Sequence, residues 1–112
     1  MLQILQYLTA SGESPFGQWF DKLDAQAAAK VTVAVTRMAA GNFGDHKSVG
    51  AGVLESRIDF GPGYRIYFGR DGDTLVILLL GGTKKRQQQD IAAAKALWQD
   101  YKTRSKAEKK DK

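Results

Sequence analysis

The sequence predicts a single α+β domain, with helices packed on one face of a mostly antiparallel four-stranded sheet and the element order β-α-α-β-β-β-α. Two capped helical segments follow an N-terminal strand, three strand-like segments then follow one another between turn residues, and a long helical segment comes last. At 112 residues the chain has room for one hydrophobic core. We expect the domain to span residues 1–104 and a basic, flexible C-terminal tail to occupy residues 105–112.

The first strand is expected within residues 2–10, which mix apolar and polar side chains over a strand's length. Ser14 and Pro15 then mark the start of a helix, because Ser caps free N–H groups and Pro has none to lose. Asp24 is suited to cap a second helix over residues 25–40, so the two helices form a hairpin. The apolar stripe of the first helix consists of Phe16, Trp19, Phe20 and Leu23.

Residues 41–52, "GNFGDHKSVGAG", are expected to form a glycine-rich loop that carries His46 and Lys47. Strands follow at about 53–60, 64–70 and 74–80. The last of these, "TLVILLL", is apolar on both faces, which predicts a strand in the interior of the sheet.

A three-residue Gly-Pro-Gly turn at 61–63 would pair Phe60 with Tyr64 and set Arg57 opposite Tyr67. Because side chains alternate along a strand, one face of this hairpin is then apolar and the other is charged. The charged face consists of Glu55, Arg57, Asp59, Arg65 and Tyr67. We expect the helices to cover the apolar face and to leave the charged face open.

Residues 84–104 are expected to form the last helix, after Gly81 and Gly82 end the strand. The charge of the chain is uneven: residues 1–80 hold seven Lys and Arg against eight Asp and Glu, whereas residues 81–112 hold ten against four. A basic end of this kind attracts a polyanion such as a nucleic acid, although many basic tails are only solvated ends.

The composition excludes several classes of site. There is no Cys and only one His, so disulfides, thiolate chemistry and an imidazole-bound metal are not expected, and neither is a cofactor. No apolar run has the length of a membrane span and the N-terminus has no export pattern, so a cytoplasmic protein without membrane contact is the default expectation.

Cations from three segments are expected to gather at one edge of the sheet. Arg57 and Arg65 lie on the strands and Lys47 in the loop, and Lys84, Lys85 and Arg86 follow the last strand. Guanidinium groups bind phosphate through paired N–H bonds and Tyr67 can stack on a base, which favours binding of RNA or another single strand. The alternative is that the strand charges form only cross-strand ion pairs.

Metal-free cleavage of RNA is compatible with these residues, because the 2′-hydroxyl of RNA is itself a nucleophile. A protein has to align that hydroxyl, lower its pKa and stabilise the phosphorane, and cations can do the last two.

The segment "GDHKSVGAGVLESRIDFGPGYRIYFGRDGDTLVILLLGGTKKRQQQDIAAAKALW" resembles the RelE/ParE toxin superfamily, in particular the HigB-like addiction-module killer proteins. The resemblance spans about residues 16–101 and rests on GPGYR and on GG-x-K followed by Gln and Asp. It implies a RelE-like fold, the toxin of a type II toxin–antitoxin pair, and an adjacently encoded helix-turn-helix antitoxin as partner.

By this resemblance the protein is a metal-independent endoribonuclease that cleaves mRNA on the ribosome and so inhibits translation. Arg57 and Arg65 match strand arginines that clamp the scissile phosphate, Lys47 matches a candidate base or phosphate contact, and Lys84 matches a phosphate-binding lysine. Lys85 and Arg86 depart from the family pattern and make this corner more basic. His46 is outside the pattern; as a loop residue beside the site it is either a general base or simply solvated.

Two other functions remain open at this point. A ParE-like chain would bind and inhibit DNA gyrase with the same fold and no nuclease chemistry. A plain RNA-binding module would use the same cations without cleavage.

Overall fold

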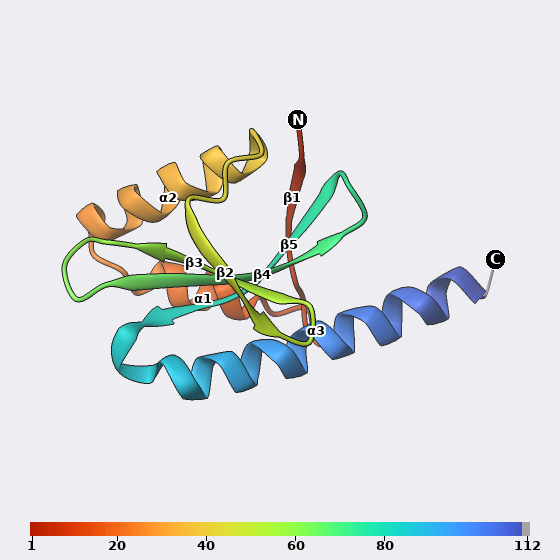
Figure 1. The fold of residues 1–112 in the computed structure, drawn as a ribbon. Helices are drawn as coiled ribbons and strands as arrows, with labels where there is room; N and C mark the ends of the chain where they lie inside the picture. The colour runs from red at the N-terminus through yellow and green to blue at the C-terminus, as the bar shows by residue number, and fades with distance from the viewer. Residues whose placement is uncertain (111–112) are drawn as a thin grey trace.

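The computed structural model describes residues 1–110, whose centre is a five-stranded sheet in the order β1-β5-β4-β3-β2 (Figure 1). The strands are β1 (Gln3–Gln6), β2 (Asp45–Gly50), β3 (Val53–Ile58), β4 (Tyr64–Asp71) and β5 (Leu75–Thr83). Strand β1 pairs in parallel with β5, and the other neighbours are antiparallel. The α+β class and the mostly antiparallel sheet are therefore confirmed, with β5 in the interior as expected.

The helices are α1 (Pro15–Asp21), α2 (Ala25–Ala39) and α3 (Gln87–Lys110), with a short 3₁₀ turn, η1 (Lys84–Arg86), before α3. Both predicted caps are present. Ser14 Oγ accepts a hydrogen bond from the Gly17 N–H at 2.9 Å, and Asp24 Oδ1 accepts one from the Ala27 N–H at 2.8 Å. None of the described helices is both long and apolar enough to cross a membrane.

The sheet has five strands instead of the predicted four. The additional strand is β2, formed by residues 45–50, which were expected to be part of a loop. This strand pairs with β3 although most of its side chains are exposed. It is held by its backbone ladder rather than by an apolar face, and only Val49 packs against the core. A strand of this kind has no alternation of apolar residues from which it could be predicted.

Helices pack on both faces of the sheet, so the prediction of helices on one face is wrong. On one face, α1 and α2 contribute Phe16, Val31 and Met38 to a core with Ile66 and Phe68. On the other, α3 contributes Ala94 and Trp98 to a second core, which also contains Tyr67 and Leu79. The charged face of the β3–β4 hairpin is therefore partly covered by α3 instead of open.

The β3–β4 register differs from the predicted one by two residues. The connection is five residues long, and the Gly63 N–H donates to the Phe60 carbonyl in a turn that leaves Phe60 outside the ladder. Arg57 therefore lies opposite Arg65 rather than opposite Tyr67. A shift of two residues keeps every side chain on its predicted face.

Helix α3 continues past residue 104 and extends beyond the sheet toward the C-terminus (Figure 1). Most of the segment predicted as a tail is therefore helical, and residues 111–112 of that segment lie outside the described residues. The flexibility of this segment stays a prediction.

Candidate functional site

The register of the sheet brings the two strand arginines side by side. Arg57 on β3 is directly opposite Arg65 on β4, and Gly82 on β5 is the next residue in this row. Directly opposed residues of antiparallel strands have Cα atoms about 4.5–5.5 Å apart. Like charges in such a pair repel, so each guanidinium needs a counter-charge or an anion between the two.

Arg57 is the exposed member of the pair. Its Nε lies 3.4 Å from Asp45 Oδ2 on β2, and the side chains of Arg57 and Asp45 are 44% and 71% exposed. An ion pair in this setting contributes little to stability, because water screens it. A phosphate group can therefore replace Asp45 as the partner of Arg57 at small cost.

Arg65 is the buried member, with 7% of its side chain exposed. Its Nε lies 3.8 Å from Glu55 Oε2 and is enclosed without a hydrogen-bond partner among the described residues. The Arg65 guanidinium is therefore held almost entirely inside the protein, directly across the ladder from Arg57 and on the same face of the sheet.

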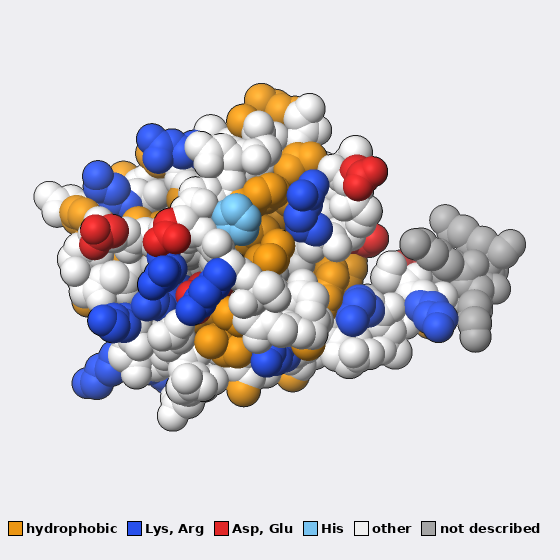
Figure 2. Space-filling model, viewed as in Figure 1, with side chains coloured by type: hydrophobic (Ala, Val, Ile, Leu, Met, Phe, Trp, Pro, Cys, Tyr) orange, Lys and Arg blue, Asp and Glu red, His pale blue; other side chains and the backbone are white. Residues whose placement is uncertain are grey.

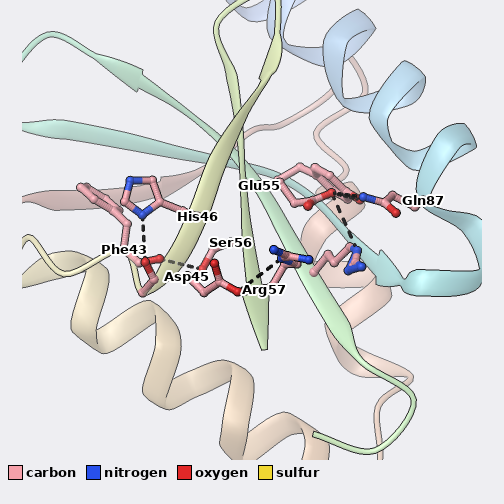
Figure 3. A network of polar contacts seen from close by, with 10 residues as sticks. Phe43, Asp45, His46, Glu55, Ser56, Arg57 and Gln87 are labelled. Carbon is pink, nitrogen blue, oxygen red and sulfur yellow. Dashed lines mark hydrogen bonds and ion pairs between the residues drawn. The ribbon is translucent and has the colours of Figure 1, made fainter. Parts of the chain in front are cut away.

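Glu55 is fully buried and lies at the centre of a polar cluster (Figure 3). Its Oε2 accepts hydrogen bonds from the Tyr67 hydroxyl and from Gln87 Nε2, each at 3.0 Å. Burial and the neighbouring Glu55 carboxylate raise the pKa of Tyr67 well above its usual range, so its hydroxyl keeps the proton that it donates. The exposed fraction of Tyr67 is zero, so its ring, predicted to stack on a base, is not accessible to RNA in this structure.

Asp90 is a second acid under the start of α3. Its carboxylate lies over Gly82, where a Cβ atom would come within 1.9 Å of Asp90 Oδ2. This oxygen is buried without a hydrogen-bond partner among the described residues, and burial raises the pKa of Asp90 although Arg86 opposes the shift. Because Gly82 is the row neighbour of Arg65, both acids lie near the buried guanidinium.

The η1 turn adds three exposed cations just after Gly82, the β5 residue that pairs with Arg65. Lys84, Lys85 and Arg86 follow β5 directly, and the Lys84 N–H donates to the Gly63 carbonyl in the β3–β4 turn. Figure 2 shows Lys and Arg side chains gathered at the end of the molecule where η1 and the start of α3 lie. Together with the next three residues they line an open hollow of about 440 Å³.

Lys47 and His46 point to opposite faces of β2. Lys47 is opposite Glu55 and so shares the face of Arg57, whereas His46 is opposite Ser56 on the α2 face. There the His46 ring contacts Phe43 edge-on, and its Nδ1 lies 2.9 Å from the Gly44 carbonyl (Figure 3). The structure thus brings Lys47 to the arginine pair and keeps His46 away from it.

The residues that sequence reasoning missed are the acids and amide that hold the cations. Asp45, Glu55, Gln87 and Asp90 were not among the candidates. The Gln and Asp of the family-like motif were a signal for two of them. Among the described residues, no group of three or more His, Asp or Glu side chains is arranged to hold a metal ion.

Chemically, this arrangement can bind an anion between fixed and adaptable cations. The Arg65 guanidinium is held in place before a ligand arrives, and preorganised donors of this kind stabilise developing negative charge best. Arg57, Lys47 and Lys84 are exposed and can move to meet phosphate groups. The site therefore has the features of a phosphate-binding surface at one corner of the sheet.

Comparison with known proteins identifies the family. A family model described as "Phage derived protein Gp49-like (DUF891)" matches residues 18–111. The chain is also 48% identical over 86 residues to a protein of Haemophilus influenzae described as "Uncharacterized protein", an overlap of 76% of this chain and 87% of the relative. The family match covers the whole sheet corner described above, and the chain belongs to the phage-derived Gp49-like family, within the RelE/Gp49 toxin-like superfamily.

Proposed function

We propose that the protein is the toxin of a type II toxin–antitoxin pair and that it cleaves mRNA without a metal ion. Membership of a toxin-like family supports the first part of the proposal. The observation that supports the second is the cross-strand pair of Arg57 and Arg65, with Lys47 and Lys84 beside it. The motifs quoted above further suggest that the chain is HigB-like.

In the proposed reaction the 2′-hydroxyl of RNA attacks the adjacent phosphorus atom. A bond forms from O2′ to phosphorus, the bond to the 5′-oxygen breaks, and the proton of the 2′-hydroxyl passes to a base while the leaving oxygen gains one. Arg65 and Arg57 bind the non-bridging oxygens and stabilise the phosphorane, in which negative charge increases. Lys47 and Lys84 bind phosphate groups of the same strand, and Lys85 and Arg86 extend this contact.

The antitoxin is expected to neutralise this corner of the protein. Carboxylates of the partner would pair with Arg57 and the η1 cations, because covering several cations without a counter-charge is costly. An adjacent reading frame for a small helix-turn-helix protein that binds this chain and abolishes toxicity would support this part of the proposal.

The test is controlled expression in bacteria with mapping of mRNA 5′ ends. We expect cuts in phase with codons in cells that produce the wild-type chain, and none with Arg57→Ala or Lys84→Ala, since both side chains are exposed and their loss leaves the fold intact. Lys102→Ala, on the C-terminal half of α3, is the matched control and should cut like the wild type.

Intact mRNA in growth-arrested cells would overturn the nuclease proposal. DNA breaks in the same cells would instead favour inhibition of gyrase by a ParE-like mode. Binding of RNA with neither cleavage nor growth arrest would leave only an RNA-binding module.

A further inference from the structure

Glu55 has two anchors besides its own strand. Tyr67 on β4 and Gln87 at the first position of α3 both donate to the same oxygen, Oε2. That oxygen is also the one nearest to Arg65 Nε. Its position is therefore fixed by three elements of the fold at once.

A buried carboxylate is costly unless donors and a counter-charge surround it. Glu55 has both at Oε2, whereas its Oε1 is buried without a partner among the described residues, and its geometry toward Arg65 is not that of a tight ion pair. The 3.8 Å separation and the enclosed, unbonded Nε indicate that the carboxylate neutralises the stem of the guanidinium without binding its end. The terminal nitrogens therefore make no hydrogen bond to Glu55, whose Oε1 is buried without a partner among the described residues and whose Oε2 accepts from Tyr67 and Gln87.

We propose that Glu55 is a positioning residue for Arg65. Held by Tyr67 and Gln87, it keeps the Arg65 guanidinium in one orientation beside Arg57, so that the two groups form a ready-made pair for a phosphodiester. This inference rests on the proposed function for its catalytic consequence, whereas the positioning itself is a property of the free protein.

A merely structural role for Glu55 predicts different results, and the chain offers a matched control. Tyr101 on α3 donates its hydroxyl to Asp71 Oδ2 at 2.6 Å, which also anchors α3 to the sheet through a tyrosine and a carboxylate. This second anchor involves neither strand arginine. Tyr101→Phe therefore removes an equivalent bond and leaves Arg65 alone.

The first experiment follows the Arg65 Nε–Hε signal by NMR in the free full-length protein. In the wild type we expect a sharp signal with slow exchange to water. Glu55→Gln, Tyr67→Phe and Gln87→Ala should shift and broaden it and speed its exchange, whereas Tyr101→Phe should leave it unchanged. Gln87 is only half-buried, so its variant keeps the test decisive if Glu55→Gln does not fold. An unchanged signal in Gln87→Ala and Tyr67→Phe would overturn the inference.

The second experiment measures single-strand RNA cleavage well below the unfolding temperature of each variant. Glu55→Gln should lower kcat by about 10²-fold with KM changed less than about twofold, because misplacing a catalytic group by an ångström has an effect of this size. Equal losses in Tyr67→Phe and Tyr101→Phe would mean that the cluster is structural.

A wild-type protein that leaves mRNA intact in growth-arrested cells would refute the proposed function, and positioning would then be judged by binding. The probe is a 2′-O-methyl RNA oligonucleotide, which cannot be cleaved through its 2′-oxygen. Shifts of both the Arg57 and Arg65 signals in the wild type, reduced for Arg65 in Gln87→Ala, would support the inference. A shift confined to Arg57 would contradict it.

Discussion

Glu55, Arg65 and Asp90 are charged residues that the sheet and α3 enclose, and each has a different balance of neighbours. Arg65 and Glu55 offset one another, and Tyr67 and Gln87 complete the hydrogen bonds of one Glu55 oxygen. Asp90 has the positive charge of Arg86 nearby but one oxygen without a partner. Glu55 also has one buried oxygen without a partner, Oε1, but its other oxygen accepts two hydrogen bonds, so at the scale of residues Asp90 is the acid with fewer compensating contacts.

We expect Asp90→Asn to change the pH dependence of stability. The folded-state pKa of Asp90 is raised above its unfolded value of 3.8, so the folded protein binds the proton more tightly than the unfolded chain does. The stability contributed by this tighter proton binding is thus fully present below pH 3.8 and is lost as the pH rises through the folded-state pKa of Asp90. The Asn variant should match the wild type in acid and be more stable at neutral pH.

The measurement is urea unfolding of both proteins between about pH 3 and pH 7, a range that covers the usual titration of Asp. The difference between the two unfolding free energies isolates Asp90, because shifts such as the lowered pKa of Asp100 are common to both. A difference that does not vary with pH would contradict the prediction.

Gly82→Ala tests the contact between the sheet and the same acid. The added Cβ would lie 1.9 Å from Asp90 Oδ2, so the buried Asp90 side chain, or α3 with it, has to shift. Overpacking of this kind typically costs about 1–3 kcal/mol of unfolding free energy. Chemical denaturation of the variant gives this value, and combining it with Asp90→Ala should recover most of the loss. Losses that simply add would show that another contact is responsible.

The site could be predicted from the sequence only in part. The basic residues were found because Arg57, Arg65 and Lys84 lie in motifs whose spacing is visible in the sequence. The burial of Arg65 and Tyr67 could not be read in the same way, since a Glu, an Arg and a Tyr on one strand face are typical of an exposed surface. One of the two donors that compensate the burial of Glu55 is Gln87, which lies far along the chain.

At the scale of elements, α3 determines which part of the charged face is covered. Its apolar stripe packs on β4 and β5, and Trp98 lies over Gly69, where a Cβ atom would come within 2.5 Å of the indole ring. The N-terminal half of the helix then covers Glu55 and Tyr67, and η1 stands beside the β3–β4 turn. The docking of one helix thus shapes the whole site.

Trp98→Ala should weaken this docking strongly. The side chain is 5% exposed and stacks on Tyr101 with ring centroids 5.2 Å apart. Removing a buried aromatic ring of this size typically costs about 3–5 kcal/mol. Thermal and chemical unfolding measure the loss, with Val33→Ala on the exposed side of α2 as the control, expected within about 0.5 kcal/mol of the wild type. Equal effects of the two substitutions would contradict this account of α3.

Elements were predictable where a local signal marks them. The caps of α1 and α2 and the apolar β5 have such signals. Strand β2 has none, because its register depends on β3, and the face on which α3 docks depends on its packing against strand residues such as Tyr67 and Leu79. These outcomes are decided by contacts between distant segments, so a local pattern does not contain them.

At the scale of the whole molecule, the positive charge is concentrated in the last part of the chain, but not all of it lies at the site. Lys84, Lys85 and Arg86 border the arginine pair, whereas Lys102 and Lys106 lie on the C-terminal half of α3. The two groups are parts of one basic sequence region that the fold separates. Their contributions to RNA binding are therefore expected to differ.

The salt dependence of single-strand RNA binding tests this difference. Each phosphate contact that is lost should reduce the slope of log K against log salt by about 0.7. We expect that reduction for Arg57→Ala and for Lys84→Ala, and almost none for Lys106→Ala. Fluorescence anisotropy at several salt concentrations measures the slopes. Equal reductions in all three variants would make the C-terminal helix, not the sheet corner, the binding surface.

Because Glu55 contacts Arg65, Tyr67 and Gln87 through one oxygen, substitutions at the two strand arginines should inactivate the protein in different ways. Arg57 and Lys84 are exposed, so losing either one should leave a folded protein that lacks the proposed activity. Loss of Arg65 leaves the buried Glu55 carboxylate without its counter-charge and should destabilise the folded protein. Inactivating substitutions should therefore fall into two classes. Variants at Arg57 are expected to accumulate as folded protein, whereas variants at the neighbouring Arg65 are expected to be degraded by proteases.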